Sequence, residues 1–206
     1  AYLMQKGEYD PESEQSFAPA LCNRIDRNTG GIVIAAKNAA ALRTMNEKIR
    51  ENQVTKRYLC LVQGIPTPAR AMLHAYLKKN SADNMVEVRD TPFPGAKEII
   101  TGYRVLERRG DHALLEVELV TGRTHQIRAH MAHIGHPLLG DGKYGINREE
   151  RRQGYKYQAL YAYKLTFAVT DSENPLSYLE GKTFAIPPEE IWFWQESGEK
   201  NRKTEK

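Results

Sequence analysis

Cysteine is scarce in this 206-residue sequence, which contains only Cys22 and Cys60. Two thiols without a Cys-x-x-Cys spacing make neither a disulfide framework nor a cysteine metal site, so we expect both to be buried, reduced and inert. No run of eighteen apolar residues occurs, and no membrane-spanning helix is expected. Residues 1–8 lack the basic start and apolar stretch of a secretory signal. These absences predict a cytoplasmic protein that does not contact a membrane.

Neither sign of charge dominates, because the sequence contains 30 Lys and Arg residues and 26 Asp and Glu residues, which gives a net charge of +4. The basic residues are more informative for their neighbours than for their number, since many lie beside aromatic residues or glycines. Examples are residues 56–58, Arg123 and residues 148–157, and Arg24, Arg27 and Arg128 are further basic residues of the same set. Cations bind phosphates and aromatic faces stack on bases, so this mixture favours RNA as the partner over a membrane.

Hydrophobic periodicity predicts many strands and few helices. Strands are expected at residues 31–36 (buried), 56–62 (central), 72–77, 85–88, 99–107, 112–120, 161–169 and 181–186. Helices are expected after Asn38, which can cap the next turn, and over residues 124–134, which Gly135 can close. Short helical turns are expected within residues 1–20 and 189–195. Because hairpins connect most strands, we predict an α+β fold with a mixed, largely antiparallel sheet and flanking helices.

The first segment with chemical potential is residues 23–31, Asn-Arg-Ile-Asp-Arg-Asn-Thr-Gly-Gly, where the expected buried strand begins. In an extended segment Ile25 points into the core, while Arg24 and Asp26 point together toward a cleft. Asp26 is then a carboxylate on a rigid element beside cations, and the two glycines let backbone amides approach a phosphate. An ordinary loop with a local Arg–Asp pair explains the same residues equally well.

The second segment is residues 120–145, which includes Thr-Gly-Arg-Thr-His-Gln-Ile-Arg. A strand that ends in Thr-Gly-Arg turns into a helix, and the N-terminal amides of a helix can receive an anion. Arg128 follows the core-facing Ile127, so its guanidinium lies at the edge of the buried face. His125 lies about one turn earlier on a nearby face. The alternative is a solvent-facing amphipathic helix.

These two segments resemble the signature motifs of the RluA-type pseudouridine synthases. That family shares an Arg-Leu-Asp-x-x-Thr-Ser-Gly block and a Thr-Gly-Arg-Thr-His-Gln-Ile-Arg block that runs on to Gly-His-Pro-Leu-Leu-Gly-Asp and Tyr-Gly, and the order and spacing hold from about Cys22 to Tyr144. The resemblance implies the pseudouridine synthase fold, with a central RNA-binding cleft. It also implies that Asp26 is the catalytic residue, that Arg128 pairs with it, and that Tyr58 stacks on the target base.

The same blocks supply Arg24, Arg123 and His125 as residues that we expect to bind the substrate. Lys56 is added from a third family element, a strand with Lys-x-Tyr, which residues 56–58 match and which contains Tyr58. Asn23 replaces a histidine that is frequent in the family and Gly30 replaces the usual serine, which suggests a subfamily. The family's Lys-Pro-x-Gly element and its upstream RNA-binding domain do not precede the first block. We therefore expect residues 1–196 to be a catalytic domain that lacks its start, and residues 197–206 to be a charged flexible tail.

The reaction that the resemblance implies is the isomerisation of specific uridines in RNA, ribosomal rather than transfer RNA, by a monomer that needs no cofactor and no metal. The uridine is flipped out of its stack, because its glycosidic bond is otherwise inaccessible. Asp26 then attacks C1′ of the ribose or begins an elimination at C2′, and the sequence does not choose between them. Arg128 keeps Asp26 ionised and aims it. Tyr58 retains the base, and its hydroxyl is a candidate for helping to remove the C5 proton.

Two other functions are compatible with parts of the sequence. A metal hydrolase would use the cluster of His125, His130, His133 and His136, but the helix ends at Gly135 and no positioned carboxylate completes a zinc site. We expect these histidines to bond to backbone or phosphate instead. A noncatalytic RNA-binding fragment is the other alternative, which the missing start favours. The joint presence of Asp26, Tyr58 and Arg128 argues against it, because binding alone needs no carboxylate beside RNA.

Overall fold

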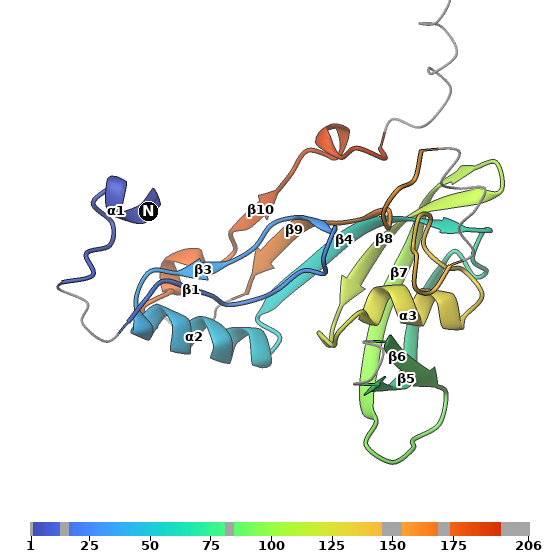
Figure 1. The fold of residues 1–206 in the computed structure, drawn as a ribbon, viewed down its shortest axis with the longest axis horizontal. Coiled ribbons are helices and arrows are strands. Elements are labelled where there is room, and N and C mark those ends of the chain that lie inside the picture. The colour runs from blue at the N-terminus through green and yellow to red at the C-terminus, as the bar shows by residue number, and fades with distance from the viewer. Residues whose placement is uncertain (1, 13–16, 81–84, 146–153, 169–173, 195–206) are drawn as a thin grey trace, which may run out of the picture.

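The computed structural model describes residues 2–12, 17–80, 85–145, 154–168 and 174–194 of the chain (Figure 1). The strands are β1 (Ala20–Leu21), β2 (Gly30–Gly31), β3 (Ala35–Ala36), β4 (Val54–Gln63), β5 (Arg70–Asn80), β6 (Met85–Arg89), β7 (Lys97–Arg109), β8 (His112–Leu119), β9 (Leu160–Phe167) and β10 (Thr183–Ala185). The helices are α1 (Tyr2–Gln5), α2 (Ala39–Arg50) and α3 (Gln126–His133), with short 3₁₀ turns at Ser177–Leu179 and Pro188–Glu190. In this described part of the chain, no helix is long and apolar enough to cross a membrane.

An eight-stranded sheet forms the body of the molecule, in the order β10-β9-β4-β8-β7-β5-β6, with β2 added beside β9. The pairs along this path are antiparallel, and β2 alone runs parallel to its neighbour. The predicted α+β class, the hairpin of β7 and β8 and the weaker pair β5–β6 are therefore confirmed. The strand predicted at residues 56–62 is indeed central, because β4 lies between β8 and β9.

The alternation of side chains along β4 separates two layers of core. Tyr58, Cys60 and Val62 pack on the face that carries Ile127 and Met131 of α3. The intervening Leu59 and Leu61 pack on the other face against the C-terminal segment around Phe193. Because successive residues of a strand point to opposite faces, this register fixes which β4 side chains reach the α3 side.

The helix after Asn38 forms as predicted. The Asn38 side chain accepts a hydrogen bond from the backbone N–H of Ala41 at 2.8 Å and so satisfies one of the unpaired amides at the start of α2. Met45 is buried and Ile49 packs beside it, against Leu165 of β9. In Figure 1, α2 and α3 lie apart, with β4 running between them. Residues of both helices line one cavity, Asn46 and Arg50 from α2 and Ile127 from α3.

The prediction of one buried strand at residues 31–36 is wrong. Gly30 and Gly31 form β2 beside β9, whereas Ala35 and Ala36 form β3, which pairs with β1 in a separate two-stranded sheet. Gly31 has a φ of +122°, which takes the chain out of the sheet. Residues 32–34 then connect β2 to β3 and are half-buried. The side chains of Ile32 and Ile34 pack against α2 and β9, which explains the hydrophobic run without a continuous strand.

Other expectations have mixed outcomes. The turn predicted at residues 189–195 is a 3₁₀ turn over Pro188–Glu190. Cys60 is buried as expected, but Cys22 is only half-buried, and both thiols are free. The predicted tail at residues 197–206 and the basic residues 148–153 lie outside the described residues.

Gly31→Ala is expected to be strongly destabilising, because a Cβ at this position would collide with the backbone of Ala162 and the φ of +122° is unsuited to other residues. We expect a loss on the order of 3 kcal/mol or more in the free energy of unfolding, measured by urea denaturation. Gly110→Ala is the matched control, since its φ is +62° and nothing lies within 4 Å of the new Cβ. It should cost only about 1 kcal/mol, and equal losses for the two variants would contradict the close-approach explanation.

Candidate active site

A cavity of about 530 Å³ opens between the C-terminal end of α2 and the turn that joins β8 to α3. All of the predicted site residues except Arg128 line it: Arg24, Asp26, Lys56, Tyr58, Arg123 and His125. Arg128 lies immediately behind the wall and contacts Asp26. The structure therefore brings together residues that are more than one hundred positions apart in the chain.

Asp26 is held by an interaction across the fold rather than by a neighbouring arginine. Its Oδ2 accepts a hydrogen bond from Nη1 of Arg128 at 3.3 Å, and its side chain is 16% exposed. Ile25 packs on the core, as the extended reading of this segment predicts. Residues 22–29 form a loop, as the alternative predicts, but the ion pair of Asp26 is with the distant Arg128 and not a local one.

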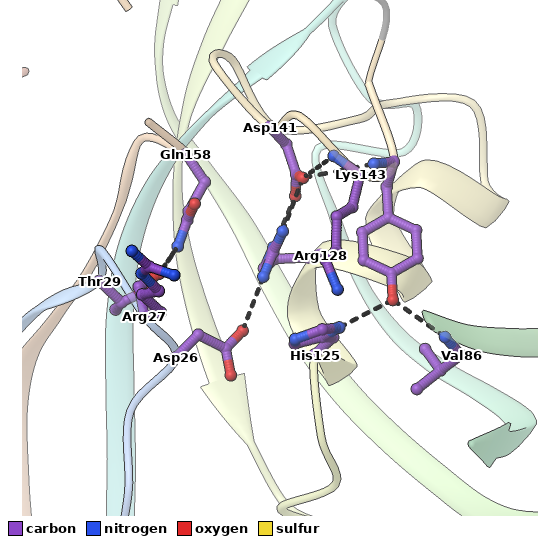
Figure 2. Close-up of polar contacts among 10 residues, drawn as sticks. Asp26, Arg27, Thr29, Val86, His125, Arg128, Asp141, Lys143 and Gln158 are labelled. Carbon is purple, nitrogen blue, oxygen red and sulfur yellow. Dashed lines mark hydrogen bonds and ion pairs between the residues drawn. The ribbon is translucent and has the colours of Figure 1, made fainter. Parts of the chain in front are cut away.

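The loop around Asp26 is braced on both sides. The side chain of Asn23 accepts a hydrogen bond from the backbone N–H of Ile34 at 2.7 Å. On the other side, Nε2 of Gln158 donates to the backbone oxygen of Arg27 at 2.6 Å and to Oγ1 of Thr29 at 3.1 Å. Because Gln158 is itself buried, these bonds fix the loop firmly and with it the direction of the Asp26 carboxylate (Figure 2).

Arg128 has a second and tighter partner, Asp141, which the sequence analysis did not single out. Nε and Nη2 of Arg128 donate to the two carboxylate oxygens of Asp141 at 2.7 and 2.8 Å, a two-pronged pair. The Asp141 side chain is 0% exposed and also accepts from the backbone N–H groups of Lys143 and Tyr144. Burial alone would lower the pKa of Arg128, but its bonds to Asp141 and then to Asp26 raise it.

Tyr58 faces the same cleft as Asp26. It projects from β4 into the core layer that contains Ile127, and its ring is 6% exposed where it lines the cavity. Burial, and then the negative charge of Asp26, raise the pKa of Tyr58 to about 12. The hydroxyl is therefore protonated near neutral pH, and the ring presents an apolar surface next to the carboxylate.

The cationic residues of the cleft differ in exposure. Lys56 is half-buried two positions before Tyr58 on the same face of β4, and burial lowers its pKa. Arg24 and Arg123 are exposed at the rim of the cavity. Polar residues that the sequence analysis did not select line the α2 side: Asn46, Arg50 and Asn52. The cleft thus combines a partly buried floor with a cationic and polar rim, an arrangement that suits a polyanion with one inserted base.

The turn before α3 is locked by Gln126. Its Oε1 accepts from the backbone N–H of Arg123 at 3.0 Å and from the hydroxyl of Thr121 at 2.9 Å. Its Nε2 donates to the backbone oxygen of Ile100 and to Thr101. This buried side chain therefore takes up the Arg123 amide, which lies in the turn before α3. A buried glutamine can be located only once the neighbouring strand β7 is known.

The four clustered histidines bind four different partners. His125 contacts the Tyr144 hydroxyl, the buried His130 contacts Thr101, His133 contacts Asp90, and His136 contacts the backbone oxygen of Gln63. Burial lowers the pKa of His130 to about 4. Among the residues that the structure describes, no group of three or more His, Cys, Asp or Glu is placed to hold a metal ion. The geometry gives the metal-hydrolase alternative no support.

Comparisons with known proteins point to one family. The family model described as RNA pseudouridylate synthase matches residues 2–133. An uncharacterized RNA pseudouridine synthase of Mycoplasma genitalium is 42% identical over 186 residues, which cover 86% of this chain and 56% of that protein. The ribosomal large subunit pseudouridine synthase C of Vibrio cholerae is 36% identical over 159 residues, covering 76% of this chain and 49% of that protein. The chain thus spans about half the length of the curated relatives that it matches.

A solved structure agrees with these sequence matches. Human RNA Pseudouridylate Synthase Domain Containing 1 superposes with a TM-score of 0.67 at 27% sequence identity, covering 82% of this chain and 69% of that chain. The mixed, largely antiparallel sheet is therefore shared with a pseudouridylate synthase domain protein.

Proposed function

Because the chain belongs to the RNA pseudouridylate synthase family, we propose that it isomerises specific uridines in RNA to pseudouridine, with Asp26 as the catalytic carboxylate. The observation that carries this proposal is the ion pair of Asp26 and Arg128 beside Tyr58 in the central cavity. A noncatalytic binding module would have no use for a carboxylate held in a cationic cleft, where it repels phosphate.

The proposed reaction begins when a uridine is flipped into the cavity, since the glycosidic bond is inaccessible in a stacked strand. Asp26 then attacks C1′ and displaces uracil, or removes the C2′ proton to start an elimination. The uracil turns in place, forms a bond from C5 to C1′ and loses its C5 proton. In the first route this bond displaces the Asp26 carboxylate from C1′, and in the second the proton removed from C2′ is returned. Arg128, fixed by Asp141, holds the carboxylate in position during these steps.

Ribosomal RNA is the proposed substrate. The relative from Vibrio cholerae is named as a ribosomal large subunit pseudouridine synthase, and the cationic rim of the cavity supports RNA as the partner. We propose that the protein is a cytoplasmic monomer and that it uses no cofactor, since cleavage of the glycosidic bond is assigned to the Asp26 carboxylate.

The test is the release of tritium from RNA that carries 5-tritiated uridine, because formation of the new C5 bond expels the C5 hydrogen. We expect release from ribosomal RNA transcripts and formation of pseudouridine at defined positions, mapped in total RNA from strains with and without the gene. If the protein binds RNA but neither releases tritium nor forms pseudouridine, the proposed activity is contradicted and the noncatalytic RNA-binding alternative is supported.

Tyr58→Phe is expected to remain near wild type in tritium release, whereas Tyr58→Leu should lose a factor of roughly 5 to 150, equivalent to about 1–3 kcal/mol of stacking. Phe keeps the ring and loses only the hydroxyl, whose raised pKa makes it a poor proton acceptor. If the hydroxyl instead assists removal of the C5 proton, Tyr58→Phe will bind RNA normally but stall after glycosidic cleavage. Chemical trapping of free uracil or of an RNA–protein adduct distinguishes the two outcomes.

A further inference from the structure

His125 occupies a strained position at the wall of the cavity. It is the residue before the first turn of α3, and its φ of +53° lies in the left-handed region that residues other than glycine seldom adopt. Its side chain makes no capping bond to the helix. Residues held in such conformations cluster at functional sites, where the surrounding structure enforces them. The conformation of His125 therefore marks its imidazole ring as a candidate for a functional contact.

A hydrogen-bond chain fixes the ring from behind. The backbone N–H of Val86, on β6, donates to the hydroxyl oxygen of Tyr144 at 3.0 Å. The same oxygen lies 2.9 Å from Nδ1 of His125, and the two rings meet edge to face with centroids 5.7 Å apart. Tyr144 is itself anchored, because its backbone N–H donates to the buried carboxylate of Asp141. Figure 2 shows the two contacts, from Val86 and from His125, meeting at this hydroxyl oxygen.

The direction of this chain favours one tautomer of His125, with Nδ1 as the acceptor. Since the Tyr144 oxygen already accepts from Val86, its own hydroxyl hydrogen is available to donate, and Nδ1 of His125 is the acceptor within reach. Nδ1 is then unprotonated, so a neutral ring carries its hydrogen on Nε2. In Figure 2 this second nitrogen points away from the tyrosine, toward the side of the pocket where Asp26 lies.

The surroundings favour the neutral ring. Burial lowers the pKa of His125, as do the nearby charges of Arg128 and Lys143, while Asp26 and Asp141 oppose this shift. The charged arginines at the rim are suited to phosphate. The neutral N–H of His125 is instead suited to an uncharged acceptor. Uracil presents carbonyl oxygens of this kind, and cytosine replaces one of them with an amino group.

We propose that His125 is a further substrate-contacting residue, which donates from Nε2–H to a carbonyl oxygen of the flipped uracil, and that Tyr144 is the positioning residue that sets its tautomer. The identity of the ligand rests on the proposed function, whereas the tautomer does not. A site that requires an acceptor oxygen discriminates against a base that offers a donor there, because two donors would face each other unpaired. When the oxygen contacted is O4, which cytosine replaces with an amino group, His125 thereby contributes to the choice of uridine over cytidine.

The tautomer is tested without RNA, by nitrogen-15 NMR of the protein with labelled histidine. In the wild type, the unprotonated ring nitrogen of His125 should be Nδ1. Tyr144→Phe should mix the tautomers, whereas Tyr103→Phe should leave His125 unchanged, since the Tyr103 hydroxyl bonds to the Pro68 carbonyl, outside the residues that line this cavity. A wild-type ring protonated on Nδ1 overturns the inference, whatever the enzyme's activity.

Contact with the base is tested by two substitutions. His125→Gln keeps a donor near the position of Nε2 and should stay within about threefold of wild type in kcat/KM for tritium release, while His125→Leu should fall about tenfold. His133→Gln and His133→Leu, on the same helix but bonded to Asp90, are the matched controls and should both resemble wild type. Equal activities of His125→Leu and His133→Leu contradict the proposed contact.

A binding measurement separates this inference from the proposed function. If the wild type releases no tritium, the proposed function fails, and the inference is judged on whether pentauridylate shifts the Nε2–H signal of His125. An equal shift with an abasic oligonucleotide of the same length would assign the contact to phosphate and overturn the uracil assignment. No shift with either probe would overturn it as well.

Discussion

Asp26→Asn is expected to abolish isomerisation, with tritium release reduced on the order of 10³-fold or more, and to leave RNA affinity close to that of the wild type. Asparagine preserves the shape of the side chain but supplies neither a nucleophilic carboxylate nor a proton acceptor. The pocket should survive the change, because Arg128 is held by Asp141 at 2.7 and 2.8 Å and only at 3.3 Å by Asp26. Loss of activity would then be a loss of chemistry rather than of structure.

The control for this variant is Asp111→Asn, which makes the same substitution at an exposed carboxylate in the turn between β7 and β8. It should retain full activity. RNA affinity of both variants is measured by fluorescence anisotropy, and their folding by urea denaturation. Turnover of Asp26→Asn within tenfold of the wild type would remove Asp26 from the catalytic role.

The elements that the sequence predicted well are those whose signal is local. The alternation in β4, the asparagine cap of α2 and the helical spacing of Ile127 and Met131 each depend on residues a few positions apart. The apolar run at residues 31–36 has the composition of a buried strand, and the prediction of one strand there is wrong. Composition does not indicate that Gly31, packed against the backbone of Ala162, turns the chain out of the sheet. That contact is set by the parallel pairing of β2 with β9, which joins distant parts of the chain.

The candidate site shows the same limit. Asp26 and Arg128 were found because they stand in recognisable motifs, yet nothing in their spacing predicts that Asp141 is the tighter partner of Arg128. The signal for Asp141 was present, as an aspartate directly after Leu138, Leu139 and Gly140. A charged residue in such an apolar context has to be paired when it is buried. The polar residues of α2 had no such signal, because only the folded chain brings that helix to the cavity.

The buried pair gives the second large expected effect. Arg128→Ala should reduce tritium release on the order of 10³-fold, since the carboxylate of Asp26 loses the group that aims it. It should also lower the free energy of unfolding by about 3–5 kcal/mol, because Asp141 is left as an uncompensated charge that is 0% exposed. Arg128→Lys should restore little of the activity or of the stability. A lysine ammonium group cannot reproduce the two bonds to Asp141 together with the bond to Asp26.

The double variant Arg128→Ala/Asp141→Asn separates the structural role of Arg128 from its role in catalysis. Asparagine removes the unpaired buried charge while its side-chain oxygen can still accept from the backbone N–H groups of Lys143 and Tyr144. We therefore expect the double variant to unfold at higher urea concentration than Arg128→Ala, while its tritium release stays equally low. Recovery of activity together with stability would mean that Arg128 acts only by neutralising Asp141. Recovery of stability alone supports a direct action of the guanidinium on Asp26, which is the role that the 3.3 Å contact suggests.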